Sequence, residues 1–128
     1  MTEPDWLSVE ECLIAHEILV VRFGGTHGLR DAGLLDSALN KPRQLFCYGS
    51  PTLYEMAAAY AFGIVKNHPF LDGNKRAGFI AASLFLESNG LRFTAPEEEA
   101  VLFTRGLAAG EVTIEEYTLW LRKSSQPA

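Results

Sequence analysis

The chain has 128 residues, of which 48% are hydrophobic and 21% charged, and its formal net charge is -5. This length and composition fit one folded domain over residues 1–128 and exclude a disordered chain. The negative charge disfavours a general nucleic-acid binder, which needs clustered Lys and Arg to neutralise phosphates. No apolar run approaches the roughly 20 residues of a membrane span, and residues 1–10 have no apolar core of a secretory signal. We therefore expect a cytoplasmic protein that does not enter membranes.

Capping signals followed by apolar residues at helical spacing predict about six helices. In chain order, these helices begin near Ser8, Asp31, Ser50 (or alternatively Thr52), Asn74, Thr94 and Thr113. Gly24-Gly25 ends the first helix. The second helix is expected to be short and to end before Pro42, because proline lacks the amide that an inner helical turn needs. Residues 41–50 then form an irregular connection, and residues 123–128 a frayed tail.

The fold class is therefore all-α, because no long alternating run predicts a sheet. Leu91–Phe93 is predicted to be a short strand or an extended linker. The helices on either side of the loop His68–Gly73 are rich in apolar residues, and we expect the one before it to be central and enclosed. Side chains without a recognisable motif are interpreted plainly: Cys12 and Cys47 as small buried groups, His16 as a core histidine and His27 as an exposed loop residue.

The segment around that loop departs from core-building composition, because it places several charged side chains between two apolar helices. A helix that begins near Asn74 exposes unpaired backbone N–H groups and the positive end of its dipole, which together attract an anion. Lys75 and Arg76 add two cations there, and Gly73 lets a ligand approach the backbone closely. These features indicate a phosphate-binding site. Lys66 is a candidate for one more phosphate contact or, alternatively, an ordinary surface lysine at a helix end.

Asp72 would repel phosphate unless a metal ion joined the two. Mg²⁺ commonly binds one carboxylate together with nucleotide phosphates and waters. His68 is the nearby side chain that can accept a proton close to neutral pH. Phosphate, metal and base together predict transfer of part of a nucleotide to an acceptor hydroxyl.

The stretch His68–Arg76, HPFLDGNKR, resembles the signature of the Fic/Doc superfamily, His-x-Phe-x-Asp/Glu-Gly/Ala-Asn-x-Arg. Lys75 stands where the adenylylating Fic branch usually has Gly, so the segment is more similar to the Doc branch of toxins. The likeness extends to Arg22–Gly25, Gly28–Leu35 and Phe85–Gly90. It covers the chain from about residue 7 to residue 121.

The resemblance implies a helical Fic fold in the toxin of a toxin–antitoxin pair, which phosphorylates a threonine of elongation factor Tu with ATP and Mg²⁺. It implies that His68 is the catalytic base and that Asp72 holds the metal. The residues implied to bind nucleotide phosphates are Gly73, Asn74, Lys75 and Arg76. A separate DNA-binding antitoxin is also implied, which places a disordered segment in a groove of the toxin, whereas the toxin itself does not contact nucleic acid.

Three rival functions are weighed against this one. A Fic-type adenylyltransferase would transfer AMP, but Lys75 crowds the place where that nucleotide pose needs room, and Phe79 stands where many such enzymes have a second Arg. A non-catalytic binding module on the same scaffold would be expected to lose part of the set His68–Arg76. A helix-turn-helix DNA reader would need a basic recognition helix, which this sequence lacks.

Overall fold

The computed structural model describes residues 2–128, and this part of the chain forms six helices and one two-stranded sheet. The helices are α1 (Val9–Phe23), α2 (Ala32–Tyr48), α3 (Leu53–Asn67), α4 (Asn74–Ser88), α5 (Glu97–Ala109) and α6 (Ile114–Lys123). The strands are β1 (Leu91–Phe93) and β2 (Ser125–Pro127). The predicted all-α class with about six helices is confirmed. Within residues 2–128, no helix combines the length and apolarity needed to cross a bilayer.

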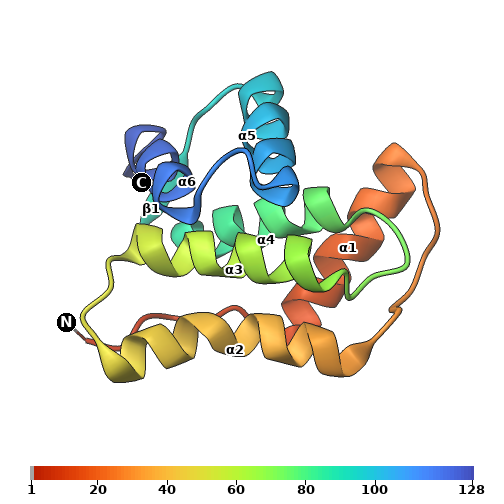
Figure 1. Cartoon of the computed structure of the whole chain (residues 1–128), viewed down its shortest axis with the longest axis horizontal. Coiled ribbons are helices and arrows are strands. Elements are labelled where there is room, and N and C mark those ends of the chain that lie inside the picture. The colour runs from red at the N-terminus through yellow and green to blue at the C-terminus, as the bar shows by residue number, and fades with distance from the viewer. Residues whose placement is uncertain (1) are drawn as a thin grey trace.

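Helix α3 is the central helix of the molecule. It lies between α2 on one side and α4, α5 and α6 on the others (Figure 1). Most of its residues are buried, as expected for a helix that is apolar around its circumference: Met56, Ala57, Ala58, Ala59, Tyr60, Ala61, Gly63, Ile64 and Val65. Its contact with α4 is close, because a Cβ on Gly78 would lie 2.9 Å from Cγ1 of Val65. The loop that joins α3 to α4 therefore starts from two tightly packed helices.

Three of the predicted capping boxes are confirmed. At Ser8, Thr52 and Thr113, the hydroxyl accepts a bond from the amide three residues on, and the glutamate there accepts one from the cap. The alternative start at Thr52 is therefore the correct one for α3. The predicted cap at Thr94 is wrong, because its hydroxyl donates to the carbonyl of Ser124 at 3.0 Å. Helix α5 begins at Glu97 without a side-chain cap.

The prediction that the second helix ends before Pro42 is wrong. Asp31 caps α2 as expected, accepting from the amide of Leu34 at 3.0 Å, but the helix continues to Tyr48, so residues 41–50 are mostly helical. Pro42 is buried on the same face as Leu35, Ala38 and Leu39. Burial of Pro42 together with the apolar residues that precede it on this face offsets a local cost of about 3 kcal/mol.

The cysteines differ in exposure. Cys12 is buried as expected, but Cys47, in the last turn of the longer α2, is exposed, so its interpretation as a buried side chain is wrong.

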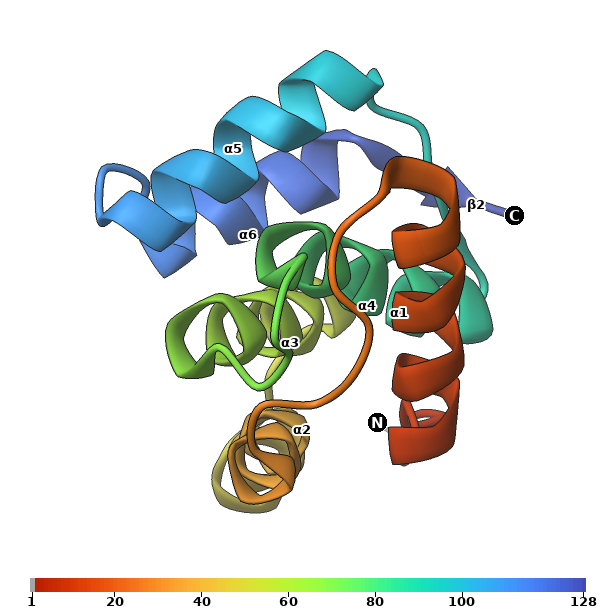
Figure 2. The ribbon, with the colours of Figure 1, turned by 90° about the vertical axis from the view of Figure 1, so that its right-hand side faces the viewer.

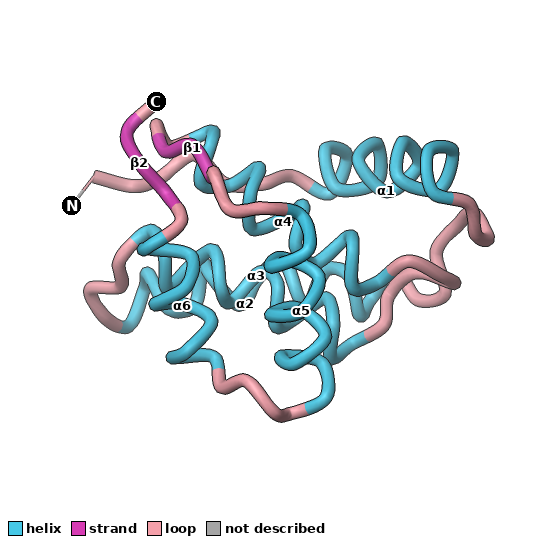
Figure 3. The backbone as a smooth tube through the Cα atoms, turned by 90° about the horizontal axis from the view of Figure 1, so that it is seen from above, coloured by secondary structure: helices cyan, strands magenta, loops and turns pink. Residues whose placement is uncertain are grey.

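The expectation of a frayed tail is also wrong. Residues Ser125–Pro127 form β2, which pairs antiparallel with β1, with Gln126 opposite Arg92 (Figure 3). The amide of Thr94 extends the pairing by donating to the carbonyl of Ser124 at 2.7 Å. The polar tail is ordered through its backbone, because the extended β1 segment needs partners for its own backbone groups.

Candidate active site

The loop His68–Gly73 connects the carboxyl end of α3 to the amino end of α4, as predicted. His68 follows the last turn of α3, with φ 49° and ψ 55° in the left-handed region. Among residues 2–128 it is the one non-glycine residue with positive φ. Its amide donates to the carbonyl of Ile64 at 3.1 Å, and its side chain is exposed. The imidazole is therefore accessible to a substrate, and the backbone that carries it is strained.

Asn74 and Phe70 hold the loop in shape. The side chain of Asn74 accepts from the amide of Phe70 and donates to its carbonyl, both at 3.0 Å. Its Nδ2 also lies 3.5 Å from Nδ1 of His68. Because both polar side-chain atoms of Asn74 are used within the loop, only its backbone N–H is available to a ligand. Phe70 is buried, as expected for a packing residue.

The amino end of α4 has the features of an anion site. Gly73 precedes it in the left-handed region, with φ 74°. A left-handed residue followed by right-handed helical residues turns successive N–H groups toward one point. Within residues 2–128, the amides of Asn74, Lys75 and Arg76 donate no hydrogen bond. The side chains of Lys75 and Arg76 are exposed beside them. The guanidinium of Arg76 lies 4.4 Å from the ring centre of Phe23, the last residue of α1.

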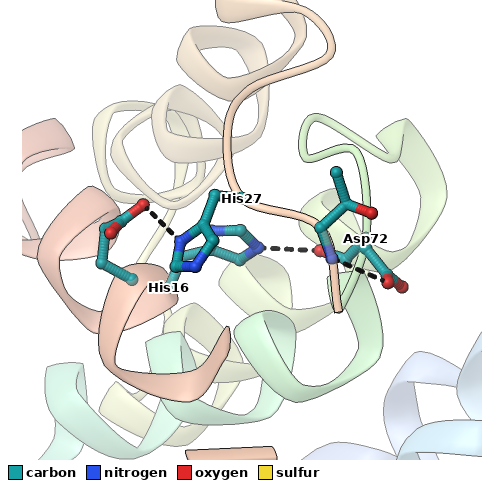
Figure 4. A network of polar contacts seen from close by, with 5 residues as sticks. His16, His27 and Asp72 are labelled. Carbon is teal, nitrogen blue, oxygen red and sulfur yellow. Dashed lines mark hydrogen bonds and ion pairs between the residues drawn. The ribbon is translucent and has the colours of Figure 1, made fainter. Parts of the chain in front are cut away.

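Asp72 is held from two sides (Figure 4). Its Oδ1 accepts from the amide of Gly73 at 2.9 Å, its Oδ2 accepts from the amide of Thr26 at 3.2 Å, and its carbonyl is 2.7 Å from Nε2 of His16. The side chain is exposed, and each oxygen keeps a lone pair for a cation. No cluster of three His, Cys, Asp or Glu ligands exists in the part of the chain described. A single carboxylate suits Mg²⁺ that arrives with nucleotide phosphates.

His16 has a role that sequence reasoning did not find. It is buried, as predicted for a core histidine, but its ring stacks on Phe70 with centroids 3.9 Å apart and planes 9° apart. Because a carbonyl can only accept, the Nε2 of His16 donates to Asp72. Through these two contacts, His16 fixes the loop against α1. His27 is exposed as expected, with Nδ1 3.0 Å from the carboxylate of Glu17.

The connection between α1 and α2 packs against the loop between α3 and α4. Figure 2 shows it (orange) running beside the loop between α3 and α4 (green). Leu29 and Phe70 form an isolated β-bridge, and the amide of Leu71 donates to the carbonyl of Gly28 at 3.1 Å. The side chain of Arg30 reaches the end of α3. These contacts join segments roughly 40 residues apart in sequence, which local patterns do not reveal.

Lys66 is exposed in the last turn of α3, just before the loop. Its ammonium lies 5.7 Å from the ring centre of Phe62, one turn back along α3. The remaining candidates, His68 and Asp72 to Arg76, are all on the loop or the first turn of α4.

Comparison with known proteins agrees with this geometry. The model of the Fic/DOC family matches residues 6–86, which include the loop and the connection between α1 and α2. The chain therefore belongs to the Fic/Doc family. Two relatives are named for the Doc branch: "Protein kinase doc" of Escherichia phage P1 is 32% identical over 91% of this chain and 93% of the relative, and "Toxin Doc" of Mycolicibacterium smegmatis is 42% identical over 74% of this chain and 71% of the relative. The expected likeness to Doc toxins is confirmed.

Proposed function

We propose that this Doc-type protein is a toxin that transfers a phosphate from ATP to a protein hydroxyl. One observation carries the proposal: within residues 2–128, the amino end of α4 has three unpartnered amides and two cations, and it adjoins a loop that bears an accessible histidine and a carboxylate. The relatives' names, a protein kinase and a toxin, support the same chemistry.

Each side chain has a role in this scheme. The amides of Asn74, Lys75 and Arg76, with the two cationic side chains, bind the phosphates and stabilise their charge during transfer. His68 accepts the proton of the attacking hydroxyl. Asp72 would hold Mg²⁺, which, when bound, neutralises charge on the phosphate oxygens.

The partners follow from the family likeness. We propose a threonine of elongation factor Tu as the acceptor, so that phosphorylation stops translation in the cytoplasm. A cognate DNA-binding antitoxin would restrain the toxin by placing a disordered segment in a groove beside the site. With a net charge of -5, the toxin itself is a poor ligand for nucleic acid.

Transfer of AMP on the same scaffold is the second candidate, and a non-catalytic binding module is the third. Lys75 fills space at the amino end of α4, which argues against the AMP pose. Phe79, at the position of a second arginine in many adenylylating members, packs on Phe93 with ring centroids 5.2 Å apart. The complete set of polar groups on the loop argues against a module that only binds.

Intact-mass spectrometry of elongation factor Tu, incubated with this protein, ATP and Mg²⁺, tests the proposal. A gain of one phosphate is expected, absent with His68→Ala and retained with the control Arg92→Ala, which removes an exposed side chain from β1. A gain of AMP would assign the adenylyltransferase reaction instead. No gain would exclude elongation factor Tu as the acceptor, and a screen of other proteins with labelled ATP would then decide between a different acceptor and a binding module.

A further inference from the structure

Arg30, in the connection between α1 and α2, binds the carboxyl end of α3 through its side chain. Its Nε donates to the carbonyl of His68 at 2.6 Å, and its Nη2 donates to the carbonyl of Asn67 at 2.7 Å. The backbone amides of Arg30 and Asp31 both donate to the carbonyl of Pro69, at 2.7 and 3.0 Å. Three successive carbonyls, from residue 67 to residue 69, are therefore fixed by Arg30 and the residue that follows it.

The peptide group that Arg30 holds is the one that determines how His68 is oriented. His68 is in the left-handed region with φ 49°, and a non-glycine residue stays there only where its surroundings impose the conformation. The direction of the His68 carbonyl is set by its ψ angle. Fixing that carbonyl, and the one before it, fixes the backbone on both sides of His68 and hence the direction in which its exposed imidazole projects.

We propose that Arg30 is a positioning residue for His68, a role that rests on the proposed function of His68 as the base. Arg30 acts through the backbone of His68 and not on the transferred phosphate. The planar guanidinium suits this task, because its fork of donors reaches two adjacent carbonyls at once. A lysine would supply the positive charge that favours a helix carboxyl end, but its single ammonium cannot reproduce the fork.

Two substitutions separate positioning from simple capping of α3. Arg30→Met keeps much of the side-chain length and removes the donors, and Arg30→Lys keeps the charge. Arg92→Met, which removes an exposed arginine from β1, is the matched control. In steady-state phosphorylation, kcat is expected to fall about 100-fold in both Arg30 variants, as for a misplaced catalytic group, with the KM for ATP unchanged. The control should match the wild type.

A second measurement does not depend on turnover. Hydrogen exchange followed by mass spectrometry is expected to be faster over residues 67–72 in Arg30→Met, because the amides of His68 and Leu71 lose the fixed backbone that pairs them. Exchange over α6 should stay unchanged. If Arg30→Met does not fold, Arg30→Lys carries both measurements.

Several results would overturn the assignment. A wild-type kcat in either Arg30 variant would do so, and recovery of kcat by lysine alone would mean that charge, not geometry, matters. A change confined to the KM for ATP would make Arg30 a nucleotide-binding residue. If the wild type itself transfers no phosphate, the proposed function fails, and unchanged exchange over residues 67–72 would refute the link between Arg30 and His68 independently.

Discussion

Gly25 leaves no room for a Cβ beside the carboxylate of Asp72, so Gly25→Ala should displace the group proposed to hold the metal. A Cβ at this position would lie 2.7 Å from Oδ2 and 3.3 Å from Cγ of Asp72. Carbon and oxygen do not approach that closely without bonding, so the carboxylate must move by roughly half an ångström. That movement opposes the bond from the amide of Thr26, which is already 3.2 Å long.

The adjacent Gly24 makes the effect measurable. Both glycines have positive φ, 115° at Gly25 and 85° at Gly24, but a Cβ on Gly24 would meet nothing within 4 Å. Because φ values this positive are unfavourable for any residue with a Cβ, each alanine should cost about 1–3 kcal/mol of backbone strain. Gly25→Ala should lose about 1 kcal/mol more with the Thr26 bond. A difference of 1 kcal/mol corresponds to about 3–5 °C in Tm for a domain of this size. The Tm of Gly25→Ala should therefore be the lowest of the three proteins, below those of Gly24→Ala and the wild type.

The decisive assay is a Mg²⁺ titration of phosphate transfer at saturating ATP, alongside melting by calorimetry. The half-saturating Mg²⁺ concentration should rise about tenfold in Gly25→Ala, the equivalent of about 1.4 kcal/mol. It should stay at the wild-type value in Gly24→Ala. Equal Mg²⁺ dependence in the two variants would mean that the position of the Asp72 carboxylate does not matter for the metal.

Further outcomes are expected at three other places. Asp72→Ala should remove activity or sharply raise its Mg²⁺ requirement while the helical circular dichroism is kept, and unchanged metal dependence would contradict its role. Arg76→Ala should weaken nucleotide binding, measured by calorimetry, roughly 10- to 100-fold, since a charge-assisted bond contributes about 1.5–3 kcal/mol. Burial raises the pKa of Cys12 to about 11, so at pH 8, below that pKa, its thiol stays protonated; only Cys47 should react with a thiol reagent until the chain is denatured.

The helix starts could be predicted wherever a side chain makes a local bond. Ser8, Thr52 and Thr113 each have a glutamate three residues on, and this reciprocal pair needs no distant partner. The same reasoning failed at Thr94, because the hydroxyl bonds to Ser124 from across the molecule. It failed at Pro42 because tertiary burial outweighs a local penalty.

The residues of the site also fall into those that local sequence places and those that only long-range contacts place. The positions of Lys75 and Arg76 were predictable from sequence, because cations at a helix start oppose the helix dipole and therefore stand out there. The supporting residues were not. His16 has the spacing of a core residue and Arg30 that of an ordinary loop cation, and their bonds span 56 and 38 residues of sequence, respectively. Only the packing of α1 and its connection against the loop gives these two side chains their role.

The backbone of His68 has a consequence for how the protein behaves when it is inactive. Its left-handed conformation costs a histidine about 1–2 kcal/mol that a glycine would not incur, and its exposed side chain supports no core. A His68→Gly chain should therefore fold at least as well as the chain with the imidazole, and His68→Ala, which keeps the Cβ and its strain, should fold about equally well. Where activity harms the host, such silent variants would accumulate without any defect in solubility or melting. Correct folding of a preparation therefore does not show that it is active, and the activity of each preparation has to be measured directly.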